Sequence, residues 1–526
     1  MSKSQTMKIN RLFLLALVLS AIVNSGCQKL ENLDNLEVTG IDAEYAIPLL
    51  STSFEMGEVL DNFDENSSVF FDENGQAILR YFGDFTSSGS DDIFAVLSIV
   101  NNIPIPLADS VSALPFAAPN GVTLDFADLK TGGFRYFFTS DHEEDITVTV
   151  SIPSLTRDGE IFSHSIGTSP YVGETPVAGG LLSPVDLAGY RLSVPEDSIY
   201  VEYHAFREVS GFADTLKAFA VIFNDVTASF VQGFLGNQVF EFERDTIEID
   251  FFENWTEGTL RFEDPTINFL IKNSFGFPVR SSINVLDVVS VNDEIFPLSS
   301  PFIEEGIDFA YPEQDEIGCI KETNFSFNNE NSNLADLLEA VPKAVDYDID
   351  GLTNPDGNTA IRGFMTDSSL LSVQVEVVLP VFGAVSNYNI FDTIKVERFD
   401  FDVDFEEYGE VDFAEFKLFS ENSIPLNIDL QLFFADENER IIDSLFTEVT
   451  PVVTAASVDA DGNTLEKSTE EAFARVTEER FERIKEARNL FLQARFSTPD
   501  AGMRSVRITA DQDVKIGMGL KVGVTR

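Results

Sequence analysis

Apolar and polar residues alternate with a period of two along much of this chain. The alternation is clearest in residues 146–152, 373–377, 399–405 and 514–524, where an apolar residue takes every second position. A period of two puts the apolar side chains on one face of a β-strand and the polar ones on the other. Half-buried strands of this kind are typical of antiparallel sheets with one face in water. The pattern predicts an all-β fold built from several antiparallel β-sandwich modules.

Turn and helix signals are sparser and fall between the predicted strands. Asn74-Gly75, Asp158-Gly159 and Asp461-Gly462 are dipeptides that favour tight hairpin turns. Apolar residues spaced by three and four predict a helix over 333–345 and a stronger one over 477–493. We therefore expect a few accessory helices, one of them near the C-terminus, and not an α/β enzyme fold.

Three short segments share one order of residues: a strand, an Asn-Asn or Asn-Ser step, an apolar residue with proline, then a new strand. They are residues 97–107, 269–279 and 418–426. Proline suits the entry of a strand because it cannot donate to the interior of a β-ladder. The segments resemble the Asn-x-x-Pro strand corner of LEA-14-like sandwich domains, which implies Ig-like or LEA-14-like modules. Chance combined with ordinary turn chemistry is the alternative explanation.

The spacing of these segments predicts a division into modules. The expected division is a signal peptide over 1–26, a tether over 27–40, a β-rich domain over 41–240, a β-sandwich over 241–385 and a second β-sandwich over 386–526 that contains the helix 477–493.

The first residues have the order of a secretory signal. Basic residues precede an apolar run over 12–23, and Ser25-Gly26-Cys27 follows it. The apolar run is too short for the roughly 30 Å hydrocarbon core of a bilayer. A cysteine at the cleavage point resembles the lipobox of bacterial lipoproteins, which implies that Cys27 is acylated and anchors the chain to a membrane. The alternative is a cleaved signal with an incidental cysteine.

Composition narrows the choice of ligands and of stabilising forces. The formal net charge is −55, from 89 acidic and 34 basic residues, so nucleic acid and anionic lipid would be repelled. Adaptation of the surface to salt and a basic partner both fit this charge. If Cys27 is acylated, only Cys319 remains and no intramolecular disulfide can form. The 49 phenylalanines then point to large apolar cores, or in part to a binding surface.

One run of acids imitates the start of an EF-hand loop. Asp346, Asp348, Asp350 and Gly351 stand at the first, third, fifth and sixth positions, but Gly357 replaces the bidentate acid required at the twelfth. These three aspartates form a candidate calcium loop, and a solvated turn is the alternative. No other cofactor is expected.

A triplet of Asp, then Ser or Thr, then an aliphatic residue recurs along the chain. Its hydroxyl residues are Ser110, Ser198, Thr215, Thr246, Thr393 and Ser444. The triplet resembles the O-glycosylation site of Bacteroidota envelope proteins, which implies that these hydroxyls carry sugars. The alternative is that Asp-Ser and Asp-Thr commonly lead out of turns into strands.

Taken together, the chain resembles large surface lipoproteins of Bacteroidota. The residues that carry this are the cysteine step at 25–27, the opening at 45–49, the Phe-Gly-Phe-Pro corner at 275–278 and the closing segment 477–526. The resemblance implies an outer-membrane lipoprotein, facing either the cell surface or the periplasm, and brings no activity with it.

The expected function is a non-catalytic, lipid-anchored module that binds or scaffolds a glycan or a protein in the envelope. A carrier or sensor that holds an apolar molecule in a Phe-lined cleft is the first alternative. A carbohydrate-active enzyme that uses two of the many acids is the second. The sequence contains no Gly-x-Ser-x-Gly elbow or Walker loop that would favour an enzyme.

Overall fold

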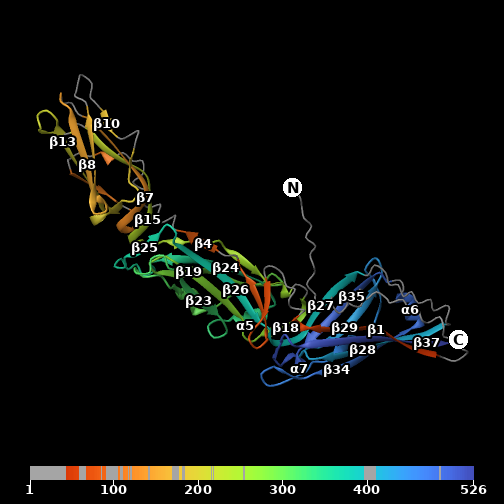
Figure 1. Ribbon diagram of the computed structural model, residues 1–526. Helices are drawn as coiled ribbons and strands as arrows, with labels where there is room; N and C mark the ends of the chain where they lie inside the picture. The colour runs from red at the N-terminus through yellow and green to blue at the C-terminus, as the bar shows by residue number, and fades with distance from the viewer. Residues whose placement is uncertain are drawn as a thin grey trace.

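The protein is built almost entirely of antiparallel strands, arranged as three bodies in an elongated row (Figure 1). The computed structural model describes residues 43–57, 67–83, 86–89, 105–106, 111–116, 118, 121–139, 143–168, 177–179, 184–214, 216, 218–252, 255–395, 410–484 and 487–525. The predicted all-β sandwich fold is confirmed. The predicted strand over 399–405 and the first strand corner at 101–104 lie outside the described residues.

One end of the row is the C-terminal sandwich. Its first sheet has the order β1-β37-β28-β34, and its second has the order β18-β27-β35-β29-β30, with β31 on β29 and β36 on β27. The strands are β1 (Ala43–Glu55), β18 (Trp255–Phe262), β27 (Phe382–Lys395), β28 (Glu410–Asn422), β29 (Asn427–Ala435), β30 (Ile441–Ser444), β31 (Thr450–Val453), β34 (Ser468–Thr477), β35 (Asn489–Ser497), β36 (Val506–Arg507) and β37 (Asp513–Thr525). The short hairpin of β32 (Ser457–Val458) and β33 (Thr464–Glu466) accompanies them.

The middle sandwich also has two sheets. One has the order β2-β3-β26-β19-β23, with β4 on β26; the other has the order β16-β24-β20-β21, with β17 on β24 and β22 on β20. The strands are β2 (Ser67–Phe71), β3 (Ala77–Phe82), β4 (Thr86–Gly89), β16 (Val239–Phe240), β17 (Asp245–Glu248), β19 (Thr266–Asn273), β20 (Val279–Ser290), β21 (Ile295–Pro297), β22 (Asp308–Phe309), β23 (Lys321–Phe327), β24 (Pro342–Thr353) and β26 (Leu370–Pro380).

The far end of the row, called the distal module below, follows the order β14-β13-β8-β12-β7-β15-β25, with β5, β6, β9, β10 and β11 attached along it. The strands are β5 (Ile105–Pro106), β6 (Val111–Pro115), β7 (Thr123–Thr139), β8 (Ile146–Arg157), β9 (Glu160–Thr168), β10 (Val177–Gly179), β11 (Val185–Asp186), β12 (Arg191–Ser193), β13 (Ser198–Arg207), β14 (Ala213–Asp214), β15 (Ala218–Phe234) and β25 (Gly363–Thr366).

A paired strand and an ion pair connect the distal module to the middle sandwich. β25 leaves the middle sandwich and pairs with β15. Beside it, the Arg362 guanidinium donates to both carboxylate oxygens of Asp125, at 3.0 and 2.6 Å, and to the carbonyl of Thr123 at 2.9 Å. Because the contact is bidentate and includes a backbone carbonyl, it fixes the orientation of Arg362 relative to β7 in addition to its electrostatic attraction.

Both sandwiches follow one chain path. The middle sandwich runs β19, β20, β23, α5 (Leu334–Leu338), β24, β26, and the C-terminal one runs β28, β29, β34, α6 (Glu478–Ile484), β35, β37. In each, the first strand pairs with the third and the last, and the second pairs with the fourth. The two sandwiches are therefore an internal repeat of one fold.

The strand corners predicted from the sequence occupy the same place in both copies. Asn273 and Asn422 are buried, and the side-chain Oδ1 of each accepts the backbone N–H two residues on, at 2.9 and 2.8 Å. The next residue, Ser274 or Ser423, brackets the first residue of the last strand of its sandwich: its Oγ accepts that residue's N–H and donates to its carbonyl. The corner thus closes each sandwich.

The sheets do not divide where the sequence predicted domain boundaries. β1 pairs along its whole length with β37, and β2, β3 and β4 belong to the middle sandwich, so 41–240 is not one unit. In each sandwich an early strand, β1 or β3, pairs with the last strand. Local sequence carries no record of such distant pairing, because the hydrogen bonds join segments hundreds of residues apart.

Both predicted helices are shorter than expected. α5 ends at Leu338 and β24 begins at Pro342, while α6 ends at Ile484 and β35 begins at Asn489. Each following strand is central in its sheet, and β35 pairs with both β27 and β29. Two ladders of backbone hydrogen bonds stabilise each of these strands more than the helical spacing of its side chains would stabilise a helix. The helices predicted over 333–345 and 477–493 were therefore wrong in their second halves. The described residues also include the helices α4 (Pro301–Glu305) and α7 (Pro499–Gly502) and the 3-10 turns η3 (Pro195–Asp197) and η4 (Asp250–Phe252).

Phenylalanine fills the cores. Among the largest fully buried side chains are Phe134, Phe138, Phe162, Phe252, Phe275, Phe277, Phe327 and Phe364. Burial of one such side chain stabilises the fold by about 1.5–3 kcal/mol. Packing in the cores thus accounts for many of the 49 phenylalanines.

Candidate hydroxyl face of the distal module

The strongest candidate site is the outer face of the sheet formed by β9, β8 and β13. The inward side chains Val148, Val150 and Ile152 are fully buried. The alternate positions therefore point outward. They carry the residues that we call the hydroxyl face: Thr147, Thr149 and Ser151 on β8, Ser163 and Ser165 on β9, and His204 and Phe206 on β13.

Pairing across the strands brings these hydroxyls together. Thr149 faces Ser165 on one side and His204 on the other, and the two hydroxyl oxygens of Thr149 and Ser165 are 2.7 Å apart. Ser151 donates to Ser163 at 3.4 Å. A hydroxyl has one donor and two acceptor sites, so each member of these pairs keeps hydrogen-bonding capacity for a ligand.

An exposed apolar hairpin borders the hydroxyl face. Phe206 is 50% exposed, and Val209 and Phe212 beside it are 86% and 68% exposed. The turn between β13 and β14 is held in place: Glu144 accepts the N–H of Ser210 at 2.9 Å. That hydrogen bond from the backbone, followed by one from the Ser210 side chain, holds the pKa of Glu144 below its ordinary value. The apolar side chains therefore stand on a braced turn.

A second feature is a shallow depression of about 520 Å³ where the distal module meets the middle sandwich. Its lining includes Asp125, Glu196, Asp197 and Arg362, and no phenylalanine. Because Arg362 and Asp125 bind one another there, the depression is part of the connection between the two bodies. It does not provide the Phe-lined cleft that a carrier would use.

The predicted calcium loop is a strand. Asp346, Asp348 and Asp350 lie on one face of β24, with Tyr347 and Ile349 buried between them. Alternate residues on a strand are about 6.8 Å apart, so the three carboxylates cannot converge on one ion. The expectation of an EF-hand-like loop is therefore wrong, since the sheet extends the segment. In the described part of the chain, no group of three or more His, Cys, Asp or Glu residues is arranged to hold a metal ion.

Protein groups already contact these aspartates. Arg244 forms a two-pronged ion pair with Asp346, with Nε at 3.0 Å from Oδ1. Asn284 donates to Asp350 at 2.7 Å and to Asp348 at 3.4 Å. On the neighbouring strand, burial and then the Asp346 carboxylate raise the pKa of Asp287. The local excess of negative charge is offset by an arginine.

The six candidate glycosylation residues have different surroundings. Ser110 and Thr215 lie outside the described residues, and Thr393 is on β27. Thr246 is exposed on β17. Ser198 donates to the carbonyl of Glu196 at 3.2 Å.

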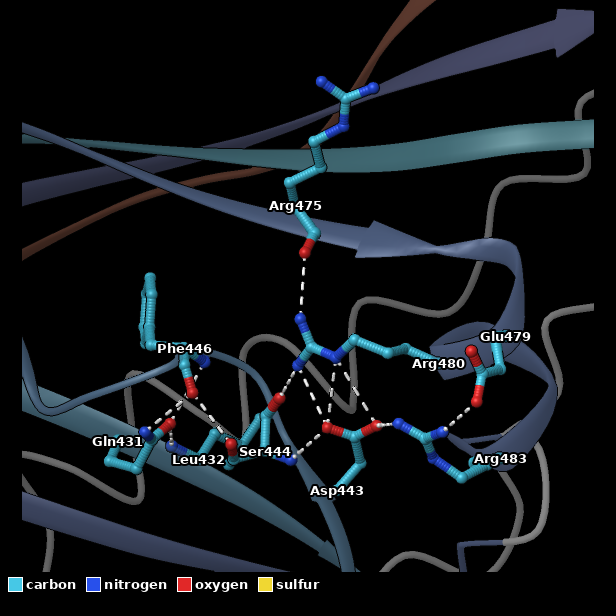
Figure 2. A network of polar contacts seen from close by, with 9 residues as sticks. All are labelled: Gln431, Leu432, Asp443, Ser444, Phe446, Arg475, Glu479, Arg480 and Arg483. Carbon is cyan, nitrogen blue, oxygen red and sulfur yellow. Dashed lines mark hydrogen bonds and ion pairs between the residues drawn. The ribbon is translucent and has the colours of Figure 1, made fainter.

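The sixth residue, Ser444, belongs to a dense polar network (Figure 2). Its hydroxyl donates to the carbonyl of Phe446 at 2.8 Å. Next to it, Asp443 lies between Arg480, at 3.0 Å, and Arg483, at 2.9 Å. The side chain of Asp443 is 9% exposed. This triplet therefore joins the β30 strand to α6.

Cys27 lies outside the described residues, and Cys319 is a free, exposed thiol. Among the described residues, no helix combines the length and apolar character needed to cross a membrane.

Comparisons with known proteins identify no family for this chain. No protein-family model matches the chain, and no curated protein matches it. A crystal structure of a Parabacteroides distasonis protein described as secreted is 12% identical, covers 91% of this chain and 99% of its own, and has a TM-score of 0.28. The infectious bursal disease virus Gt strain structure is 6% identical over 92% of this chain and 80% of its own, with a TM-score of 0.14. At these scores the similarities carry no inference about function.

The hydroxyl face was missed in the sequence. Its signal was present in the alternation Thr147, Thr149, Ser151, which predicted only a strand. Three separate strands build the face, and no local pattern in the sequence indicates that β9 and β13 flank β8.

Proposed function

We propose that this protein is a lipid-anchored envelope protein that presents the hydroxyl face of its distal module, as a non-catalytic binding site, away from the membrane. The position of β1 carries the proposal. β1 is the first described strand after the cysteine, and Ala43 pairs with Val524 at the end of β37. In Figure 1 that end of the C-terminal sandwich is at one end of the row, and the strands β8 and β13 of the distal module are at the other end.

An acyl anchor at Cys27 would therefore hold the C-terminal sandwich near the bilayer. The middle sandwich and the contact between Arg362 and Asp125 would then hold the distal module outward. The hydroxyl face is an open sheet surface, which suits association with a large ligand. A reaction site is more often an enclosed concavity that excludes water.

The test is fractionation and protease shaving of intact cells that produce the native chain or Cys27→Ala. We expect the native protein in the membrane fraction and Cys27→Ala in the soluble fraction. Cleavage of the native protein on intact cells would put the distal module on the cell surface, and cleavage only after membrane rupture would put it in the periplasm. Co-fractionation of Cys27→Ala with membranes would contradict the anchor.

A further inference from the structure

The hydroxyl face differs from the rest of this chain in its lack of charge. The protein has a formal net charge of −55, yet none of the seven residues of the hydroxyl face carries a carboxylate, an ammonium or a guanidinium group. Two acids border it directly: Glu202, two residues before His204 on β13, lies across from Ser151, and Glu208 accepts a hydrogen bond from Thr147 at 2.6 Å. The face therefore offers no cation to an acidic partner, and only these two bordering carboxylates to a basic one.

The geometry of the face is a regular array. Successive outward residues on β8 are about 6.8 Å apart, and neighbouring strands are about 4.8 Å apart. Hydroxyls at these positions offer both donors and acceptors over an extended, pleated surface. Such an array suits a ligand that is itself extended and rich in hydroxyls, because many weak hydrogen bonds can form in register.

Phe206 adds an apolar element at the edge of the array. It is half exposed and stands opposite Thr147 on the adjacent strand. A pyranose ring has an apolar C–H face as well as polar edges. Stacking that face on Phe206 would remove apolar area from water while the sugar hydroxyls bond to the threonine and serine side chains.

We propose that the hydroxyl face binds an uncharged polysaccharide. A neutral ligand fits the charge distribution best. Acidic glycans would be repelled by the field of the whole chain, and a basic protein would find most of the 89 acidic residues on other surfaces. The inference rests on the proposed function, since it names the ligand class of the same face. It does not depend on where the protein is anchored.

Affinity electrophoresis in native gels tests the inference with purified protein that begins after the cysteine. The gels contain one of a panel of soluble neutral polysaccharides, with α- and β-linked glucans, a mannan and a xylan, or the anionic polysaccharide alginate. We expect retardation by at least one neutral polymer and none by alginate. The double variant Thr149→Val, Ser165→Ala and the single variant Phe206→Ser should each weaken binding at least five-fold. Thr469→Val, the same change at an exposed position on β34, should bind like the native protein.

Several results would overturn the inference. Absence of retardation across the neutral panel, retardation by alginate alone, or equal binding by the native protein and both face variants would each do so. Concentration-dependent dimerisation that Phe206→Ser abolishes would assign the face to a second copy instead. Circular dichroism melting of each variant shows that it is folded. The anchor is judged separately by the Cys27→Ala fractionation, so failure of one proposal is distinguishable from failure of the other.

Discussion

The strand corner of the C-terminal sandwich gives the sharpest stability prediction. Asn422 is 1% exposed, and its side chain makes three short hydrogen bonds. Oδ1 accepts the N–H of Ile424 at 2.8 Å, while Nδ2 donates to the carbonyls of Ile424 and Thr454 at 2.7 and 2.8 Å. Asn422→Ala removes all three.

The cost follows from what each partner loses. The Ile424 carbonyl keeps the N–H of Ala456, and the Thr454 carbonyl keeps the hydroxyl of Ser468, so the Ile424 N–H is the group left unpaired in a buried place. An unpaired buried N–H costs about 1–3 kcal/mol, and each lost hydrogen bond about 0.5–1.5 kcal/mol. We expect Asn422→Ala to lower the free energy of unfolding by about 2–4 kcal/mol.

The equivalent corner of the middle sandwich gives an internal comparison. Asn273 makes two such bonds, to the Phe275 N–H at 2.9 Å and the Ala310 carbonyl at 3.1 Å. Asn273→Ala should therefore cost about 1.5–3 kcal/mol, less than Asn422→Ala. Asn438→Ala, at an exposed turn position, is the matched control and should change stability by less than about 0.5 kcal/mol.

Urea unfolding followed by hydrogen exchange is the assay. Global unfolding gives the free energies, and exchange of the peptide that contains the corner assigns each change to its own sandwich. Asn422→Asp adds a pH test. A carboxylate buried beside two carbonyls should have a raised pKa in the folded state, so the variant should gain stability as pH falls through that pKa. If Asn422→Ala unfolds like Asn438→Ala, the corner does not stabilise the sandwich and the reasoning is refuted.

Three further predictions concern other contacts. Burial alone would raise the pKa of Asp443, but hydrogen bonds from Arg480, the Ser444 N–H and Arg483 hold it below the ordinary value. The stabilisation from this carboxylate is therefore present above the unfolded pKa of about 3.9 and is lost as pH falls through the lowered folded pKa. Asp443→Asn should lower the free energy of unfolding by about 1–3 kcal/mol at neutral pH. In urea titrations at a series of pH values, the variant should also lose less stability than the native protein at acidic pH. Arg362→Ala should leave each body folded but broaden the distances between spin labels on the distal module and the middle sandwich, and unchanged distances would show that the other contacts of this junction, such as β25 with β15 and Lys130 with Asp367, set the geometry. Gly159 has a φ of 85°, so Gly159→Ala should lower stability by about 1–2 kcal/mol by thermal unfolding, whereas a change within error would mean that the β8–β9 turn relaxes at no cost.

Features that depend on neighbours in the chain could be predicted from the sequence. Asn74-Gly75, Asp158-Gly159 and Asp461-Gly462 all lie in turns where the glycine has a positive φ, which only local sterics decide. The corners at Asn273 and Asn422 were recognisable because the bond from Oδ1 to the N–H two residues on is also local. Neither feature needs a partner from elsewhere in the fold.

The candidate site could not be predicted to the same extent. The alternation around Thr149 indicated one strand with a polar face, but the face becomes an array only when Ser165 and His204 lie beside it. For the aspartates at 346, 348 and 350, the sequence predicted a site that the structure does not form. Their spacing fits the start of a calcium loop, and only the pairing of β24 with β20 shows that they lie along an extended strand.

The sequence by itself determined the class of fold, the turns, the corners and the strongly acidic surface, because each follows from composition or from interactions within a few residues. The tertiary structure decided which strands share a sheet. It paired β1 with β37 and placed β35 between β27 and β29, which ends α6 at Ile484. It also brought three strands together as the hydroxyl face. The physical reason is that β-pairing satisfies backbone groups through hydrogen bonds between distant segments, and any segment with suitable alternation can supply them. Partner choice is then set by the packing of whole sheets, which no local pattern encodes.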